Sequence, residues 1–153
     1  MQPCCKSVLW LTLILVGLPG MSWAADAMAG SLKSFAGQVV VQRGAEVIPC
    51  REGMHMFEHD VLRTGADGQA GIILSDGTRV SIGPKTELGI ERFLFEPAAG
   101  EFSLIMRLAR GVLAYVSGRI AQFSPQAVKV ETPVGVIGLR GTEFAVTLDP
   151  GGT

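Results

Sequence analysis

The sequence predicts an all-β protein, built as a single compact domain of about ten short strands that follows an N-terminal signal helix. Short apolar stretches with a period of two residues recur along the chain, and turn residues separate them. The 20 glycines and eight prolines suit many tight turns. With 153 residues, 48% hydrophobic and 18% charged, the chain is sized for one domain, and this composition excludes a disordered chain.

Residues 1–24 have the features of a secretory signal peptide. Lys6 provides a positive charge, residues 8–18 form an apolar run, and Ser22-Trp23-Ala24 places small residues at the cleavage position. The run is shorter than the ~20 residues of a membrane-spanning helix. We therefore expect export to the periplasm of a Gram-negative-type envelope, with no integral membrane segment once the signal is cleaved. An uncleaved signal that anchors the protein in the inner membrane is the alternative.

The body of the chain, residues 35–149, is expected to form the β domain, and residues 150–153 a flexible tail. Segment 102–109 has a period of two and is expected to be a strand, although its Leu and Met residues favour a helix. The sequence leaves open whether the strands form a sandwich, a roll or a short β-helix. Expected strands cover residues 37–43, 46–49, 60–64, 69–75, 79–83, 88–93, 102–109, 111–116, 128–132 and 144–148.

A hairpin at residues 69–83 is the clearest local prediction. Apolar residues alternate on both sides of Asp76-Gly77. An Asp-Gly pair between two alternating runs predicts a two-residue type I′ turn, because glycine readily adopts positive φ. Thr64-Gly65 is expected to form a second structural turn.

Four motifs follow one another in an order that resembles the FecR-like domain family: GQVVVQRG, DVLRTGADGQAGIILSDGTRVSIGPKTELGI, LARGVLAYVSGRI and VETPVGVIGLRGTEFAV. The resemblance covers residues 37–148. The best-known members of the family are inner-membrane regulators, whose cytoplasmic segment binds a sigma factor and whose domain of this kind receives a signal outside. The expected signal peptide implies instead a stand-alone exported member, a sensing or protein-interaction module with an envelope protein as its partner.

The resemblance also draws attention to Arg140-Gly141-Thr142, near the end of the domain. As a functional site, this turn would bind a partner or an anion, with the guanidinium as a planar donor. As a purely structural turn, which is the simpler interpretation, it would use glycine for a special φ and threonine for a backbone hydrogen bond.

No catalytic residues can be assigned from the sequence. Only two histidines are present, and no nucleophile elbow, phosphate-binding loop or carboxylate pair stands out. We therefore expect a protein that is not an enzyme and that has no cofactor. The net charge of −1 and the scattered Lys and Arg residues argue against nucleic-acid binding. The oligomeric state stays open.

One group of residues suggests a less favoured alternative, a soft-metal site for copper or zinc. Thiol, thioether and imidazole groups lie within ten residues, although their spacing matches no standard motif: Cys50, Met54, His55, Met56 and His59. The simpler interpretation of Cys50, the one cysteine left after signal cleavage, is a small buried apolar residue.

Three arginines in the second half, Arg107, Arg110 and Arg119, suggest contact with an anionic envelope polymer. A solvated strand face explains them more simply. A polymer-binding or structural module is therefore the alternative to protein interaction.

Overall fold

The computed structural model describes residues 27–139 and 141–149. The expected signal peptide, Arg140 and the expected tail at 150–153 lie outside these residues. Almost all regular structure in the described part is strand, which confirms the predicted all-β class. None of the helices in this part is long and apolar enough to cross a membrane.

Twelve strands and two short helical segments make up the described chain. In order they are β1 (Met28–Ala36), β2 (Val39–Arg43), β3 (Glu46–Pro49), β4 (His55–Phe57), β5 (Val61–Thr64), β6 (Gln69–Leu74), β7 (Arg79–Ile82), β8 (Glu87–Glu96), β9 (Glu101–Val116), the helix α1 (Arg119–Phe123), the 3₁₀ turn η1 (Pro125–Ala127), β10 (Val128–Thr132), β11 (Gly135–Gly138) and β12 (Glu143–Leu148).

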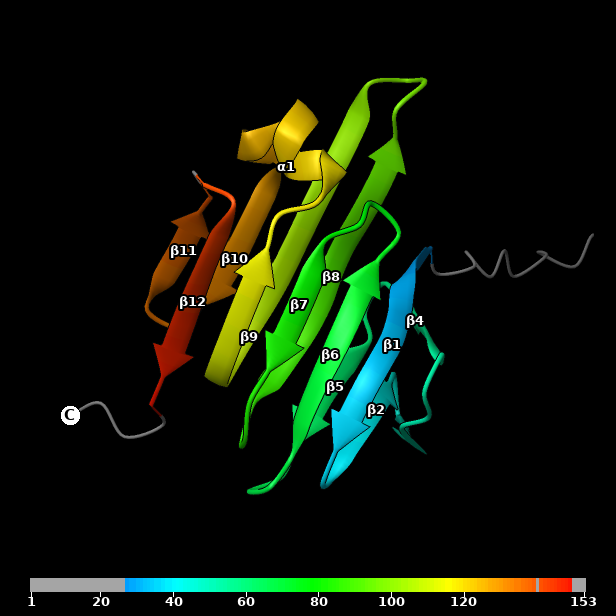
Figure 1. The fold of residues 1–153 in the computed structure, drawn as a ribbon, viewed down its shortest axis with the longest axis vertical. Helices are drawn as coiled ribbons and strands as arrows, with labels where there is room; N and C mark the ends of the chain where they lie inside the picture. Colours follow the sequence, from blue (N-terminus) through cyan, green and yellow to red (C-terminus); the bar gives the residue numbers. More distant parts are fainter. Residues whose placement is uncertain (1–26, 140, 150–153) are drawn as a thin grey trace, which may run out of the picture.

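The strands form one curled sheet with the order β3-β2-β5-β8-β9-β7-β6-β1-β4. The first half of β9 also pairs with β10, which pairs with β11, and its second half pairs with β12. The sheet thus folds into two layers that share β9, with the apolar core between them (Figure 1). All pairs are antiparallel except β9–β10. The fold is a sandwich-like roll, because stacked β-helix coils would need parallel pairing throughout.

Strand β9 joins two segments that the sequence analysis separates. In the first part of the strand the even-numbered residues Leu104 and Leu108 are buried, whereas in the second part the odd-numbered residues Leu113 and Tyr115 are buried. The change of parity coincides with a shift in the β8–β9 register, next to Arg110. An irregularity of this kind re-aims the side chains that follow it. One 16-residue strand can therefore bury its apolar residues in both layers.

The predicted hairpin at residues 69–83 is present as β6 and β7, with the predicted apolar residues facing the core. Its turn differs from the expected two-residue type I′ turn. Leu74 N donates to Thr78 O, and only Gly77 has positive φ (86°) in the turn between them. A type I′ turn needs positive φ at both central residues, so this is a three-residue loop with glycine in the left-handed position.

Strands β1, β4 and β11 were not predicted. Strand β1 is rich in Gly, Ala and Ser, which have weak strand preference. Its Gly30 lies so close to β6 that an added Cβ would be 2.4 Å from Ile73 O. Strands β4 and β11 have only three and four residues, too few for a recognisable alternation.

Candidate interaction site at the open edge

The described sheet leaves two strands unpaired on one side at the same end of the molecule. Strand β11 pairs only with β10, and β12 pairs only with β9. Figure 1 shows β10, β11 and β12 together at one side, opposite β1 and β4. Side chains on the inner faces of the two edge strands are only partly buried, because no further strand covers them: Ile137, Phe144, Val146 and Leu148. We call β11, β12 and the pocket beside them the open edge.

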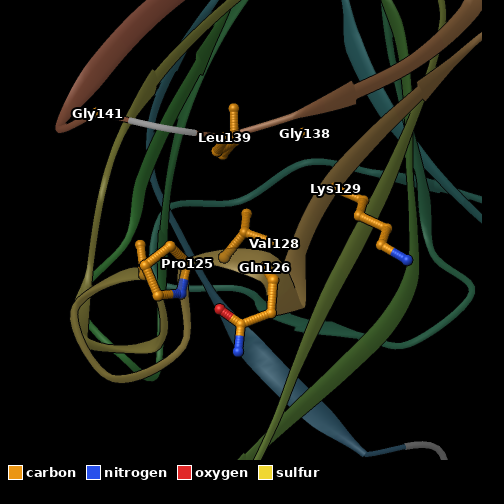
Figure 2. A pocket seen from close by; sticks show the side chains of 8 residues that line it. Pro125, Gln126, Val128, Lys129, Gly138, Leu139 and Gly141 are labelled. Carbon is orange, nitrogen blue, oxygen red and sulfur yellow. The ribbon is translucent and has the colours of Figure 1, made fainter.

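A pocket of about 710 Å³ lies at the open edge. Its apolar wall includes Val128 and Leu139, both buried, while Gln126 supplies an amide (Figure 2). The remaining lining residues are Ala121, Pro125, Lys129, Gly138 and Gly141. The pocket thus joins α1, η1, the β10–β11 hairpin and the segment that leads to β12.

The α1 side of the pocket is held by a buried carboxylate. Asp76, with no exposed surface, accepts hydrogen bonds from Thr78 N (3.0 Å), Thr78 Oγ1 (2.8 Å) and Ile120 N (3.1 Å). The Ile120 amide belongs to the first turn of α1, where backbone donors lack helical partners. The residue predicted as a hairpin turn former therefore also fixes the start of α1.

The β10–β11 hairpin presents the most exposed apolar side chains at this edge. Val134 is 86% exposed and Val136 is 63% exposed. Thr132 Oγ1 donates to Gly135 O at 2.7 Å across the turn between the strands. A fixed turn that holds apolar side chains in solvent beside an unpaired strand is typical of an interaction surface.

The outer face of β9 and β10 carries a charge network. Arg107 Nη2 lies 3.0 Å from Glu131 Oε2, and Arg107 Nε lies 3.5 Å from Glu91 Oε1. The hydrogen bond with Glu131 and the charge of Glu91 raise the pKa of Arg107. Lys129, two residues before Glu131, is exposed and forms no ion pair within the described residues.

Two of the three predicted partner-binding residues are described, and both adjoin the open edge. Gly141 lines the pocket, with φ +141°. Gly141 O accepts a hydrogen bond from Ser117 Oγ (2.9 Å), and Thr142 O accepts one from Ser117 N (2.8 Å). The described part of this turn is therefore held to the end of β9 through its carbonyls.

The predicted turn at Thr64-Gly65 is a packed junction. Thr64 Oγ1 donates to Gly83 O (2.7 Å) and accepts from Thr86 N (2.8 Å), and Gly65 N donates to Gln38 O (2.8 Å). These bonds join the ends of β5 and β7 to the start of β2. Like the Asp76-Gly77 turn, this one organises the backbone within the fold.

The structure places the five residues of the metal hypothesis in different environments. His55 is exposed and Met56 is fully buried, because neighbouring residues of β4 point to opposite faces. Cys50 is buried, and burial raises the pKa of its thiol, which disfavours the thiolate that binds metals. Among the described residues, no group of three or more His, Cys, Asp and Glu side chains has a metal-binding arrangement. Met54 is half-buried against the core, and His59 is exposed at a turn with φ 66°.

Two of the arginines considered for polymer contact are paired with glutamates. Arg107 contacts Glu91 and Glu131, and Arg110 Nη2 lies 3.5 Å from Glu87 Oε2. The guanidinium of Arg119 lies over the Phe95 ring, 5.3 Å from its centroid. The contacts of Arg107 and Arg110 favour the simpler interpretation of a solvated strand face, whereas Arg119 lies in α1 and not on a strand.

The shortest ion pair in the described fold was not predicted from the sequence. Asp60 is fully buried and accepts hydrogen bonds of 2.7 Å from both Nε and Nη2 of Arg43. Phe57 N also donates to this carboxylate (2.9 Å). Arg43 ends β2 and Asp60 immediately precedes β5, and no local pattern links residues so far apart in the chain. Only the strand pairing could have revealed them.

Comparison with known proteins decides the family. The sequence model of the family described as "FecR protein" matches residues 60–153, more than half of the chain. The chain belongs to the FecR family. The match begins at the buried Asp60 and includes β5 to β12, and thus the whole open edge of this FecR domain. No match was found among curated proteins or among solved structures.

Membership of the FecR family places the chain among regulatory and signalling domains that act through partner proteins. The family is not known for catalysis, which agrees with the expectation from the sequence.

Proposed function

We propose that this FecR domain is a non-catalytic protein-interaction or sensing module of the cell envelope, and that it binds a periplasmic protein partner at the open edge. The observation that carries the proposal is the exposure of Val134, in the turn before β11, and of Val136, within β11, because one edge of β11 is unpaired in the described sheet. Unpaired edges invite strand addition, and native proteins usually protect them by shortness, charge or proline. A partner that covers this edge would satisfy its backbone groups and bury its apolar side chains.

The other two edges of the described sheet are better protected. Strand β3 has four residues, begins with Glu46 and ends with Pro49, and β4 has three residues. A proline removes a backbone donor, and short strands offer few hydrogen bonds. Strand β11 is as short as β3, but it contains no charged residue and no proline and lies beside the pocket, and β12 has six residues without proline. The open edge is therefore the more suitable surface for a partner.

A photo-crosslinking amino acid at Val136, compared with the same residue at Val47, tests the proposal in living cells. Val47 lies in β3 and is 59% exposed, so the two positions match in residue type and in exposure. We expect position 136, and not position 47, to crosslink specifically to an envelope protein. Equal crosslinking from both positions, or none above background from position 136, would reject the open edge as the binding surface.

A further inference from the structure

The open edge has an electrostatic feature that bears on the chemistry of its partner. Lys129 pairs in register with Gly138, the last residue of β11. Paired residues on neighbouring strands project from the same face of a sheet. Because glycine has no side chain, no side chain at this position of β11 separates Lys129 from the unpaired edge of the strand. An added Cβ at Gly138 would meet no atom within 4 Å.

The ammonium group of Lys129 is available to a partner at the unpaired edge of β11. Its side chain is exposed, forms no ion pair with the described residues, and points away from Val128 and Leu139 in Figure 2. The nearest acidic side chain along β10, Glu131, is bound to Arg107. The same cross-strand row contains exposed Arg92, through the pairs Arg92–Ile105 and Ile105–Lys129. The row is therefore positive and lacks a counter-charge among the described residues.

We infer that the partner adds a strand to β11 and places an Asp or Glu side chain opposite Gly138, within reach of Lys129; this inference rests on the proposed function. An added strand would lie about 10 Å from β10, a distance that one Lys and one acidic side chain can bridge. The partner's next two residues face Ile137, on the inner side of the sheet, and Val136, on the outer side. Both positions favour apolar side chains.

A second copy of this chain is a poorer occupant of the same edge. Antiparallel self-pairing of β11 would place Val136 opposite Gly138 and Ile137 opposite Ile137, since paired residues share a face. Strand β11 contains no acidic residue, so Lys129 would gain no partner and the two copies would each keep an uncompensated positive row. Charge complementarity therefore favours a different, acidic strand.

Two synthetic peptides test this inference on the purified protein. The first, acetyl-Thr-Val-Val-Glu-Val-Val-Thr-amide, offers its acid and its apolar neighbours in either strand direction. The second has Lys in place of Glu. Binding is followed by NMR through the backbone amides of Ile137 and Gly138. We expect the Glu peptide to bind about five-fold more tightly than the Lys peptide, the range of an exposed ion pair. We also expect Lys129→Glu to reverse this order.

Arg92→Glu is the matched control, because it changes the net charge equally but lies two strands further from the added one. It should change the ratio of the two affinities much less than Lys129→Glu. If both peptides perturb the β11 amides but bind with equal affinity, the acidic partner is overturned and the proposed function is left intact. Peptides that never perturb β11, although position 136 crosslinks to a partner, would overturn strand addition at β11. A dimer that Val136→Lys dissociates would overturn the inference in favour of a second copy.

Discussion

The Asp76 carboxylate accepts a hydrogen bond of 3.1 Å from Ile120 N, which ties the β6–β7 turn to the start of α1. The same carboxylate accepts two hydrogen bonds from Thr78, and Thr78 Oγ1 accepts one from Gly118 N (3.1 Å). A turn between two strands thus holds the helix that borders the pocket. The open edge depends on contacts made far from it in the sequence.

Replacing Asp76 with Ala should strongly destabilise the fold. The change removes acceptors for two buried backbone amides and one hydroxyl, and we expect a loss of about 3 kcal/mol in the free energy of unfolding. Urea unfolding measures this loss. Asp67→Ala, at the other Asp-Gly pair, is the control. Asp67 is exposed and accepts one long hydrogen bond (3.3 Å) from Gln38 N, so the loss should stay below about 1 kcal/mol. Equal losses would contradict the role given to Asp76.

Gly118→Ala should disrupt the same junction by steric contact. An added Cβ would lie 2.3 Å from Thr78 N and 2.7 Å from Asp76 Oδ2, so the buried turn would have to move. We expect a destabilisation of about 2–3 kcal/mol, measured by thermal or urea unfolding. Gly138→Ala adds the same methyl group where no atom lies within 4 Å, and should change stability by no more than about 0.5 kcal/mol. A tolerant Gly118 would show that the junction is loosely packed.

The Arg43–Asp60 pair should matter more to stability than any surface pair. Arg43→Ala leaves the fully buried Asp60 carboxylate without its bidentate partner, and we expect a loss of about 3–5 kcal/mol. Arg63→Ala removes a 3.1 Å contact with Glu87 between partly exposed side chains and should cost less than about 1 kcal/mol. Chemical denaturation of both variants compares them. A small effect at Arg43 would mean that Asp60 finds other partners.

The features that the sequence predicted correctly depend on residues close together in the chain. The β6–β7 strands were predicted because Ala70, Ile72 and Leu74 alternate beside an Asp-Gly pair, and both signals lie within a few residues. The predicted turn type was wrong. A type I′ turn needs positive φ at Asp76, but Asp76 does not adopt positive φ, and its carboxylate accepts a hydrogen bond from Ile120 N of α1. The sequence pattern does not predict that contact.

The candidate site was predicted only in part. Arg140-Gly141-Thr142 drew attention through the family resemblance, and Gly141 does line the pocket. Lys129 was part of an expected strand and had no special role. Its importance depends on the glycine opposite it, and this relationship appears only when β10 and β11 are paired in register. The metal hypothesis grouped residues by their distance in the sequence, whereas in β4 His55 is exposed and Met56 is buried.

The buried side chain of Tyr115 should lower the stability of the fold at alkaline pH. Its hydroxyl is buried beside Thr78 and Ser117, yet no described atom meets hydrogen-bond geometry with it, and burial raises its pKa. At a pH above about 10 the unfolded phenol ionises while the folded one keeps its proton, so the unfolded state binds fewer protons and stability falls as the pH rises.

Tyr115→Phe should remove that part of the alkaline loss. Because no described atom meets hydrogen-bond geometry with the hydroxyl, we also expect the variant to be between unchanged and about 1 kcal/mol more stable at neutral pH. Tyr115 is the chain's one tyrosine, so the difference between the two proteins isolates this phenol. Urea unfolding at neutral and alkaline pH measures it. A destabilised variant with an unchanged pH slope would show that the hydroxyl is hydrogen-bonded, for instance through water.

The central claim is that the open edge is where this FecR domain binds its partner, and amide hydrogen exchange tests it most directly. Exchange is measured by mass spectrometry on the domain alone and with the envelope protein captured at position 136. We predict that amides of β11 and β12 exchange more slowly in the complex, because the partner covers or pairs with the unpaired edges, while those of β3 are unchanged. Slower exchange in β3 with none at β11 or β12 would contradict the claim.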